Sequence, residues 1–419
     1  MKKLIYAAGV LSVGGINLAV QAAEGGSKPW TVGLTAQGFY DDNINTAPDG
    51  PGKVGSWGAY ISPSVNYAQT WDQTSLNLGA AYGAYYYADT QGTLDNDWSQ
   101  TASVSIDAKH TFSPRMSLEL TDTFQLFQNA NQVLLGQTGR INGNNISNDG
   151  ELALTVEIMP RWSVVVAYEN VLFRYEEDQY ASVLDRIENY GRVDLRYLMT
   201  PKTVAVAGTK IGKVNYDSGM PFNPFFPENP TLNPPADIKN NTTYFAYGGF
   251  DHSFTPNLTG SLRAGAEIQD YTEFDISTQV NPYLDVSLTY QYALNSSAQF
   301  GIIHRSNATD VTGTFDFSTD TFEPVLEQIS TALYVNVKHA ITGKLSGSLT
   351  ASFQSSEFVG GGRYDGENEQ WWSAGATVSY AFTHNLSAQV SYYYDLLNSD
   401  IPSRDYNRNR VFFGISATY

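Results

Sequence analysis

The chain of 419 residues contains no cysteine, so disulfide bonds cannot stabilise it. It has only five histidines, and neither an H-E-x-x-H frame nor a G-x-S-x-G frame occurs in it. Beyond residue 22 no stretch approaches the roughly 20 consecutive apolar residues that a transmembrane helix needs. These absences argue against a secreted domain stabilised by disulfides and against a helical inner-membrane protein. They also argue against an enzyme, because neither of these two catalytic motifs is present.

Basic residues are also scarce, because 24 Lys and Arg stand against 42 Asp and Glu. The net charge of −18 makes nucleic acid an unfavourable partner. Tyrosine, phenylalanine and glycine are abundant instead, at 28, 21 and 36 residues. This composition is typical of membrane strands bordered by aromatic girdles.

The first 22 residues have the pattern of a secretory signal peptide. Lys2 and Lys3 precede an apolar run that extends from Leu4 to Val20, and small residues end the segment at Ala22. The alternative is an N-terminal anchor helix, but glycines interrupt the apolar run. We therefore expect a signal peptide over residues 1–22 and one body over residues 23–419.

Apolar and polar residues alternate strictly over long stretches, which indicates strands with two different faces. In one example Leu76, Leu78 and Ala80 alternate with Asn77 and Gly79. The stretches run for about 10 to 14 residues, longer than those of a soluble sandwich and long enough to cross a membrane. The expected strands are 30–40, 57–70, 74–87, 98–112, 116–127, 150–159, 163–174, 187–199, 203–214, 243–254, 258–270, 281–294, 297–306, 328–340, 344–356, 370–382, 386–397 and 408–419.

The expected strands number 18 and alternate between very short and longer connections. The short connections, such as Ser113-Pro114-Arg115 and Thr200-Pro201-Lys202, carry residues that favour tight turns. In lipid, unpaired backbone groups force such strands to close into a ring. The sequence therefore predicts an all-β protein, a transmembrane antiparallel barrel of the outer membrane with short periplasmic turns and long extracellular loops.

The end of the chain resembles the terminal signal by which outer-membrane barrels are recognised for insertion. Phe413, Ile415 and Tyr419 alternate with small or polar residues, although Ala417 stands where a bulkier residue is common. The resemblance implies the barrel-assembly machinery and outer-membrane lipid as partners.

Charged residues at inward positions of the expected strands are the candidate pore lining. Both signs occur, which suits a polar channel, but the same residues could be ion pairs that brace the wall. The candidates are Lys109, Glu119, Glu157, Arg192, Asp194, Arg196, Arg263, Glu267, Asp285 and Lys338.

Two connections exceed the usual loop length, residues 128–149 and residues 215–242. The second contains Phe222, Pro224, Phe225 and Phe226, a stiff apolar group that is costly to leave in water. It could fold into the lumen as a constriction, dock on a partner, or form a cap without a gating role.

Two acidic features allow a functional and a plain interpretation. Asp41, Asp42 and Asn43 could ligate a cation, but turn-forming side chains at a loop entry explain them more simply. Acidic residues also gather in the expected outer loops, where they would attract cations or merely be solvated. They are Asp89, Asp95, Asp97, Glu176, Glu177, Asp178, Asp365, Glu367 and Glu369.

At Phe39-Tyr40-Asp41-Asp42-Asn43-Ile44 the sequence resembles the family of putative beta-barrel porins. This family includes outer-membrane proteins found beside exopolysaccharide-export genes. The motif is short, and the barrel architecture carries the likeness over nearly the whole chain after residue 22. The resemblance implies a channel-like barrel and provides no catalytic residue.

The first expectation for function is a porin-like channel in the outer membrane through which small polar solutes, with cations preferred, diffuse passively. The alternative is a structural barrel with a blocked lumen whose loops bind polysaccharide. Neither interpretation requires enzymatic activity, a metal or a cofactor. A homotrimer is a candidate assembly for either.

Overall fold

The computed structural model describes residues 29–94, 96–127, 133–134, 137–138, 145–176, 178–217, 236–271, 278–311, 313–316, 318 and 321–419. The expected signal peptide, Asp95, Glu177 and the group Phe222, Pro224, Phe225 and Phe226 lie outside these residues. Predictions about them therefore stay predictions.

The described residues form strands almost throughout. The barrel strands are β1 (Trp30–Asp41), β2 (Ser56–Thr70), β3 (Thr74–Tyr87), β4 (Trp98–Ser113), β5 (Met116–Phe127), β8 (Asn145–Met159), β9 (Trp162–Tyr175), β10 (Arg186–Thr200), β11 (Thr203–Tyr216), β12 (Asn241–Thr255), β13 (Leu258–Tyr271), β14 (Gln279–Ala293), β15 (Ser296–Asn307), β17 (Thr321–Ala340), β18 (Leu345–Gly360), β19 (Asn368–Ala381), β20 (Leu386–Ser399) and β21 (Tyr406–Thr418). The smaller elements are β6 (Val133–Leu134), β7 (Gln137–Thr138), β16 (Gly313–Asp316), α1 (Asp178–Leu184), η1 (Ala236–Lys239) and η2 (Gly362–Tyr364).

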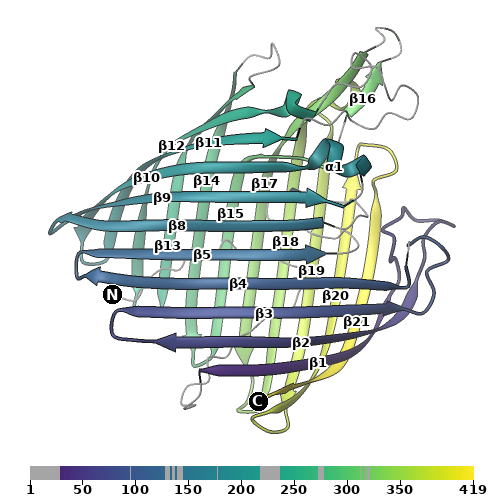
Figure 1. Cartoon of the computed structure of the whole chain (residues 1–419), viewed down its shortest axis with the longest axis horizontal. Helices are drawn as coiled ribbons and strands as arrows, with labels where there is room; N and C mark the ends of the chain where they lie inside the picture. The colour runs from purple at the N-terminus through teal and green to yellow at the C-terminus, as the bar shows by residue number, and fades with distance from the viewer. Residues whose placement is uncertain are drawn as a thin grey trace.

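Each barrel strand pairs antiparallel with the next one along the chain, and β1 pairs with β21 to close the ring (Figure 1). At the seam the backbone N–H of Val32 donates to Tyr419 O over 2.9 Å, and the N–H of Tyr419 donates back to Val32 O over 2.8 Å. The predicted closed barrel of 18 antiparallel strands is confirmed.

Tight turns join the strands at one end of the barrel, which we call the short-turn end. The predicted proline turns are present there, for example at Pro114-Arg115 between β4 and β5. Asn295, between β14 and β15, has a φ of 55°, a conformation that asparagine tolerates better than most residues. β1 begins and β21 ends at this same end, and the longer connections leave and re-enter the described strands at the opposite end, the long-loop end.

The structure corrects the prediction mainly at the long-loop end. β8 begins at Asn145, so the last five residues of the expected loop 128–149 belong to a strand. β17 begins at Thr321 instead of 328, and β16 pairs with its extension beyond the barrel (Figure 1). Among the described residues, no helix has the length and hydropathy needed to cross a membrane.

The outward face of the ring is apolar and is bordered by aromatic pairs at both ends. Trp30 packs against Tyr67 with ring centroids 4.5 Å apart at the short-turn end. Tyr86 packs against Trp98 with centroids 5.1 Å apart near the long-loop end. This arrangement matches the two interfaces of a bilayer, so the strands are membrane-spanning segments.

Candidate functional site: the barrel lumen

Strand register places all ten predicted pore-lining residues on the inward face. Lys109 is paired with Glu119, for example, and Arg263 with Asp285, on neighbouring strands. Residues paired across antiparallel strands point to the same side of the sheet. The structure therefore brings these side chains to the lumen, although their part in permeation stays a proposal.

Arg192 on β10 is the centre of a group of linked ion pairs and hydrogen bonds on the inward wall. Its Nη2 donates to both carboxylate oxygens of Glu151 over 2.9 Å, and its Nη1 donates to Asp194 Oδ2 over 2.8 Å. The hydroxyl of Tyr247 donates to the other oxygen of Asp194 over 2.6 Å. The guanidinium charge is thus balanced within the wall, so Arg192 braces strands more than it faces a solute.

Asp251 on β12 holds two further arginines of the predicted set. Arg263 Nη2 lies 2.8 Å from Asp251 Oδ1, and Arg196 binds the other carboxylate oxygen. Asp251 is 5% exposed, so breaking this group would leave buried charge uncompensated. Both arginines are therefore structural components of the wall.

The remaining predicted residues are spread along the lumen. Lys109 pairs with Glu119, and Glu157 lies 3.9 Å from Arg115 at the short-turn end. Glu267 Oε2 accepts the backbone N–H of Ser306 over 2.9 Å. Lys338, also at the short-turn end, is exposed to the lumen.

The first acidic motif is part of the wall and its edge. Asp41 on β1 accepts hydrogen bonds of 2.9 Å from Arg408 Nε, and Asp42 accepts from the backbone and side chain of Asn409. The carboxylates are thus committed to arginine and amide donors, which supports the plain interpretation of this motif. Within the described residues no group of three or more His, Cys, Asp or Glu is arranged to hold a metal ion.

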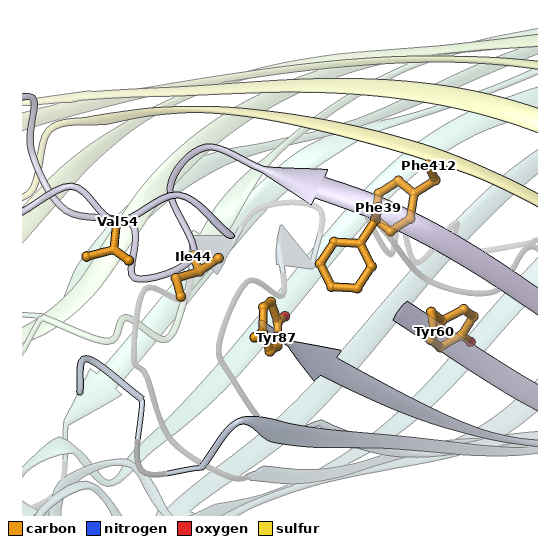
Figure 2. Close-up of a cluster of buried hydrophobic side chains, with 6 residues drawn as sticks. All are labelled: Phe39, Ile44, Val54, Tyr60, Tyr87 and Phe412. Carbon is orange, nitrogen blue, oxygen red and sulfur yellow. The ribbon is translucent and has the colours of Figure 1, made fainter. Parts of the chain in front are cut away.

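The connection between β1 and β2, residues 42–55, folds against the inward wall and is here called the inward loop. Its Ile44 and Val54 are 2% and 3% exposed and pack in one cluster with Phe39, Tyr60 and Tyr87 (Figure 2). Phe412, inward on β21, completes the cluster. The inward folding of residues 42–55 was not predicted from the sequence.

A second segment, residues 308–311 after β15, lies at the long-loop end and is here called the strap. Ala308 packs against the cluster of Val214, Tyr216 and Ala236 on β11 and η1. Val311 packs with Val325 of β17, with Phe358 of β18 and with Ile401, which belongs to the connection between β20 and β21.

The strap therefore contacts three parts of the ring, namely β11, the neighbouring strands β17 and β18, and the connection after β20. Seven barrel strands lie between β11 and β20 in a ring of 18. The strap is also held by charge, because Asp310 Oδ1 lies 3.2 Å from Arg404 Nη2 in the β20–β21 connection. It therefore narrows the lumen at the long-loop end.

Arg404 also binds Glu369, whose Oε2 lies 2.8 Å from Arg404 Nε. Glu369 is 2% exposed and faces the lumen on β19, so it is not part of a solvated acidic rim. This corrects its assignment to the outer loops.

Lys239, the last residue of η1, is buried near Asp310 of the strap. Among the described residues its Nζ has no hydrogen-bond partner, and it lies 5.1 Å from the centre of the Tyr216 ring. Burial, reinforced by the nearby Arg186 guanidinium, lowers the pKa of Lys239 to about 7, although the Asp310 carboxylate acts in the opposite direction.

Sequence reasoning missed several inward residues for two different reasons. Lys210 and Glu169, which pair over 2.7 Å, occupy inward positions of expected strands, so the period-two pattern could have identified them. Asp310 and Arg404 lie in connections, where no periodicity shows that residues 94 positions apart meet. Only the three-dimensional course of the loops brings them together.

The overall form is similar to that of several solved outer-membrane proteins. The FrpB iron transporter from Neisseria meningitidis (F3-3 variant) is 12% identical, with a TM-score of 0.42 and 90% of this chain covered, and the chain spans 63% of that transporter's length. A BenF-like porin from Pseudomonas fluorescens Pf-5 is 10% identical, with a TM-score of 0.47 and coverage of 93% and 99%. OpdK from Pseudomonas aeruginosa with vanillate is 10% identical, with a TM-score of 0.44 and the same coverages. No curated protein matches the chain in sequence.

The location of the protein follows from its architecture. A closed antiparallel ring with an apolar outer band, aromatic borders and a polar interior is the form taken by proteins of the bacterial outer membrane. The chain is accordingly an outer-membrane protein. Its residues 306–419, from the end of β15 to the end of the chain, match the family model described as "Putative beta-barrel porin 2", which agrees with the resemblance seen in the sequence.

Proposed function

We propose that the protein is a channel for the passive diffusion of small polar solutes, with a preference for cations. The observation that carries the preference is an excess of carboxylates on the inward face of the described barrel strands, leaving aside Glu327 at the bulge of β17. Fourteen carboxylates face inward: Asp41, Asp107, Glu119, Asp149, Glu151, Glu157, Glu169, Glu188, Asp194, Asp251, Glu267, Asp285, Glu369 and Asp395. Ten cations face them: Lys109, Arg186, Arg192, Arg196, Lys210, Arg263, Arg305, Lys338, Arg408 and Arg410.

The excess would act on permeating ions because it is not cancelled locally. Within the described strands, Asp107, Asp149 and Asp285 form no ion pair with a basic side chain. A polar passage with low-dielectric walls and net negative charge concentrates cations and disfavours anions. No energy coupling is required for such a channel.

The inward loop and the strap would limit the size of the solute. A barrel of 18 strands is wide enough for an aqueous lumen. Segments that pack inside it reduce the free cross-section, so small solutes are favoured over large ones. The segment with Phe222, Pro224, Phe225 and Phe226 stays a candidate for a further constriction.

The test is to reconstitute the refolded chain without residues 1–22 in a planar bilayer and to record single-channel current. A salt gradient across the bilayer then gives the ratio of cation to anion permeability. Stepwise currents with a reversal potential of the sign for cations would support the proposal. Stepwise currents with a reversal potential of the sign for anions would refute the cation preference but would still support a channel.

The strap favours a second candidate, a barrel whose lumen is blocked and whose loops bind an envelope polysaccharide. A segment that packs against β11, β17, β18 and the β20–β21 connection could close the passage completely. In that case the bilayer would stay silent, also after deletion of residues 218–238. An acidic and a neutral exopolysaccharide, added to the protein in detergent, would then be tested for binding by the change in tryptophan fluorescence.

A further inference from the structure

Arg305 on β15 differs from the other inward arginines. Register places it on the lumen side, opposite Ser330 of β17. Within the described strands each of the other inward arginines binds a carboxylate: Arg186 to Glu188, Arg192 to Glu151, Arg196 and Arg263 to Asp251, Arg408 to Asp41 and Arg410 to Asp395. Arg305 forms no such ion pair in this part of the chain, and its Nε is buried without a hydrogen-bond partner.

The groups around Arg305 come from distant strands. Its charge interacts with Glu169 of β9 and with Glu267 of β13, and it acts on Asp149 of β8 and Asp285 of β14. None of these carboxylates is within ion-pair distance of the guanidinium among the described residues. Arg305 is therefore a positive charge on the lumen side that no ion pair within the described strands neutralises, among carboxylates that come from four strands.

Its position in the chain places this charge close to the narrow part of the lumen. The strap begins three residues later, and Tyr190, whose phenol interacts with Arg305, packs in the same cluster as Ala308 of the strap. A solute that passes the strap would therefore pass Arg305.

We propose that Arg305 is a specificity-determining residue of this channel, one that opposes the surrounding carboxylates and limits the preference for cations. The proposal rests on the function proposed above. A charge already paired in the wall has little net field, whereas an unpaired charge in a low-dielectric passage acts on every ion that passes. Removal of the positive charge would leave Asp149, Glu267 and Asp285, which form no ion pair within the described strands, with less opposing charge.

The first experiment measures reversal potentials in a KCl gradient for the wild type, Arg305→Gln, Arg305→Lys and Lys338→Gln. We expect Arg305→Gln to raise the ratio of cation to anion permeability severalfold and Arg305→Lys to stay near the wild type. Lys338→Gln removes the same charge from an unpaired inward residue at the short-turn end, and we expect a clearly smaller change. An Arg305→Gln ratio equal to that of the wild type, or to that of Lys338→Gln, would overturn the proposal.

The second experiment does not depend on ion flow. The chain contains no cysteine, so a single Ile303→Cys substitution places a reporter at the next inward position of β15. The rates of its modification by a cationic and by an anionic thiol reagent give the local electrostatic potential. We expect the ratio of cationic to anionic rate to rise severalfold when Arg305→Gln is added.

The two experiments separate the two proposals. Absence of current in all variants, together with the expected change in the rate ratio, would refute the channel and retain the electrostatic role of Arg305 in the lumen. An unchanged rate ratio in a conducting channel would refute the role of Arg305 and retain the channel.

Discussion

Asp310 and Arg404 form an ion pair of 3.2 Å, although Asp310 follows β15 and Arg404 follows β20, four positions further along the ring. The pair fixes the strap on one side of the lumen, and the apolar contacts of Ala308 fix it on the other. Because the pair joins two connections and not two strands, it can be removed without disturbing the hydrogen bonds of the barrel.

Arg404→Gln should therefore loosen the strap and raise the single-channel conductance. The neutral side chain keeps some hydrogen-bonding capacity but loses the charge that holds Asp310 and Glu369. Arg363→Gln is the control, because Arg363 is an exposed cation at the same end of the barrel. Conductance that is unchanged in Arg404→Gln, or raised equally in both variants, would show that the strap does not limit the current.

The assignment of the two faces can be tested at neighbouring residues of β13. Leu262 points outward and Ser261 inward, where its hydroxyl lies 2.7 Å from that of Ser287. Leu262→Arg should destabilise the barrel by roughly 2 to 4 kcal/mol, since a charge would enter the lipid-facing band. Ser261→Arg should cost less and change the conductance, because the new charge would lie beside Asp251 in the lumen. Urea unfolding in lipid vesicles measures the difference, and equal losses would contradict the assignment.

The buried Lys239 predicts a particular dependence of stability on pH. Burial lowers its pKa from the ordinary 10.5 to about 7 in the folded chain, so the free energy of unfolding is reduced by the full amount below pH 7. This reduction then declines as the pH rises towards 10.5, because the unfolded state binds the extra proton over this range. Lys239→Met should stabilise the protein by at least about 1.4 kcal/mol at pH 6, the equivalent of one pKa unit, and by much less at pH 10. Unfolding midpoints at the two pH values test this, and an equal gain at both would be the contrary result.

The packing of the inward loop can be tested at Ile44. Truncation to alanine in a buried cluster typically costs about 2 to 5 kcal/mol, and here the loss should appear as local opening of the loop. Lys53 lies in this loop and is a cleavage site for trypsin. Ile44→Ala should accelerate cleavage at Lys53, whereas Ile61→Ala on the outward face should not. Equal cleavage rates in the two variants would argue against the packing of Ile44.

The sequence allowed the strands to be predicted because one rule, alternation with a period of two, acts on every strand of a membrane barrel. Outward positions meet lipid and inward positions meet polar surroundings, so Leu262 and Ser261 could be assigned to faces without a structure. The short turns were equally predictable, since Pro114, Pro201 and Asn295 each impose a local backbone conformation.

The site was predicted less completely, because its geometry depends on contacts that no local rule encodes. Arg263 and Asp285 are register neighbours, yet Arg263 forms its ion pair with Asp251 on the other adjacent strand. The inward folding of Ile44 depends on a pocket made by β1, β2, β3 and β21 together. The signal peptide, the homotrimer and the constriction at Phe225 stay predictions.

The seam between β1 and β21 has a consequence for how the chain reaches its native form. Every other strand pair joins neighbours along the chain, so hairpins can assemble locally and quickly, whereas the seam joins Val32 to Tyr419. Ring closure is thus the one step of barrel pairing that joins the two ends of the polypeptide. The entropic cost of closing the long loop between them is incurred at this step. Until the last residues arrive, β1 presents an unpaired edge, which makes the interval before closure the period of greatest exposure to aggregation.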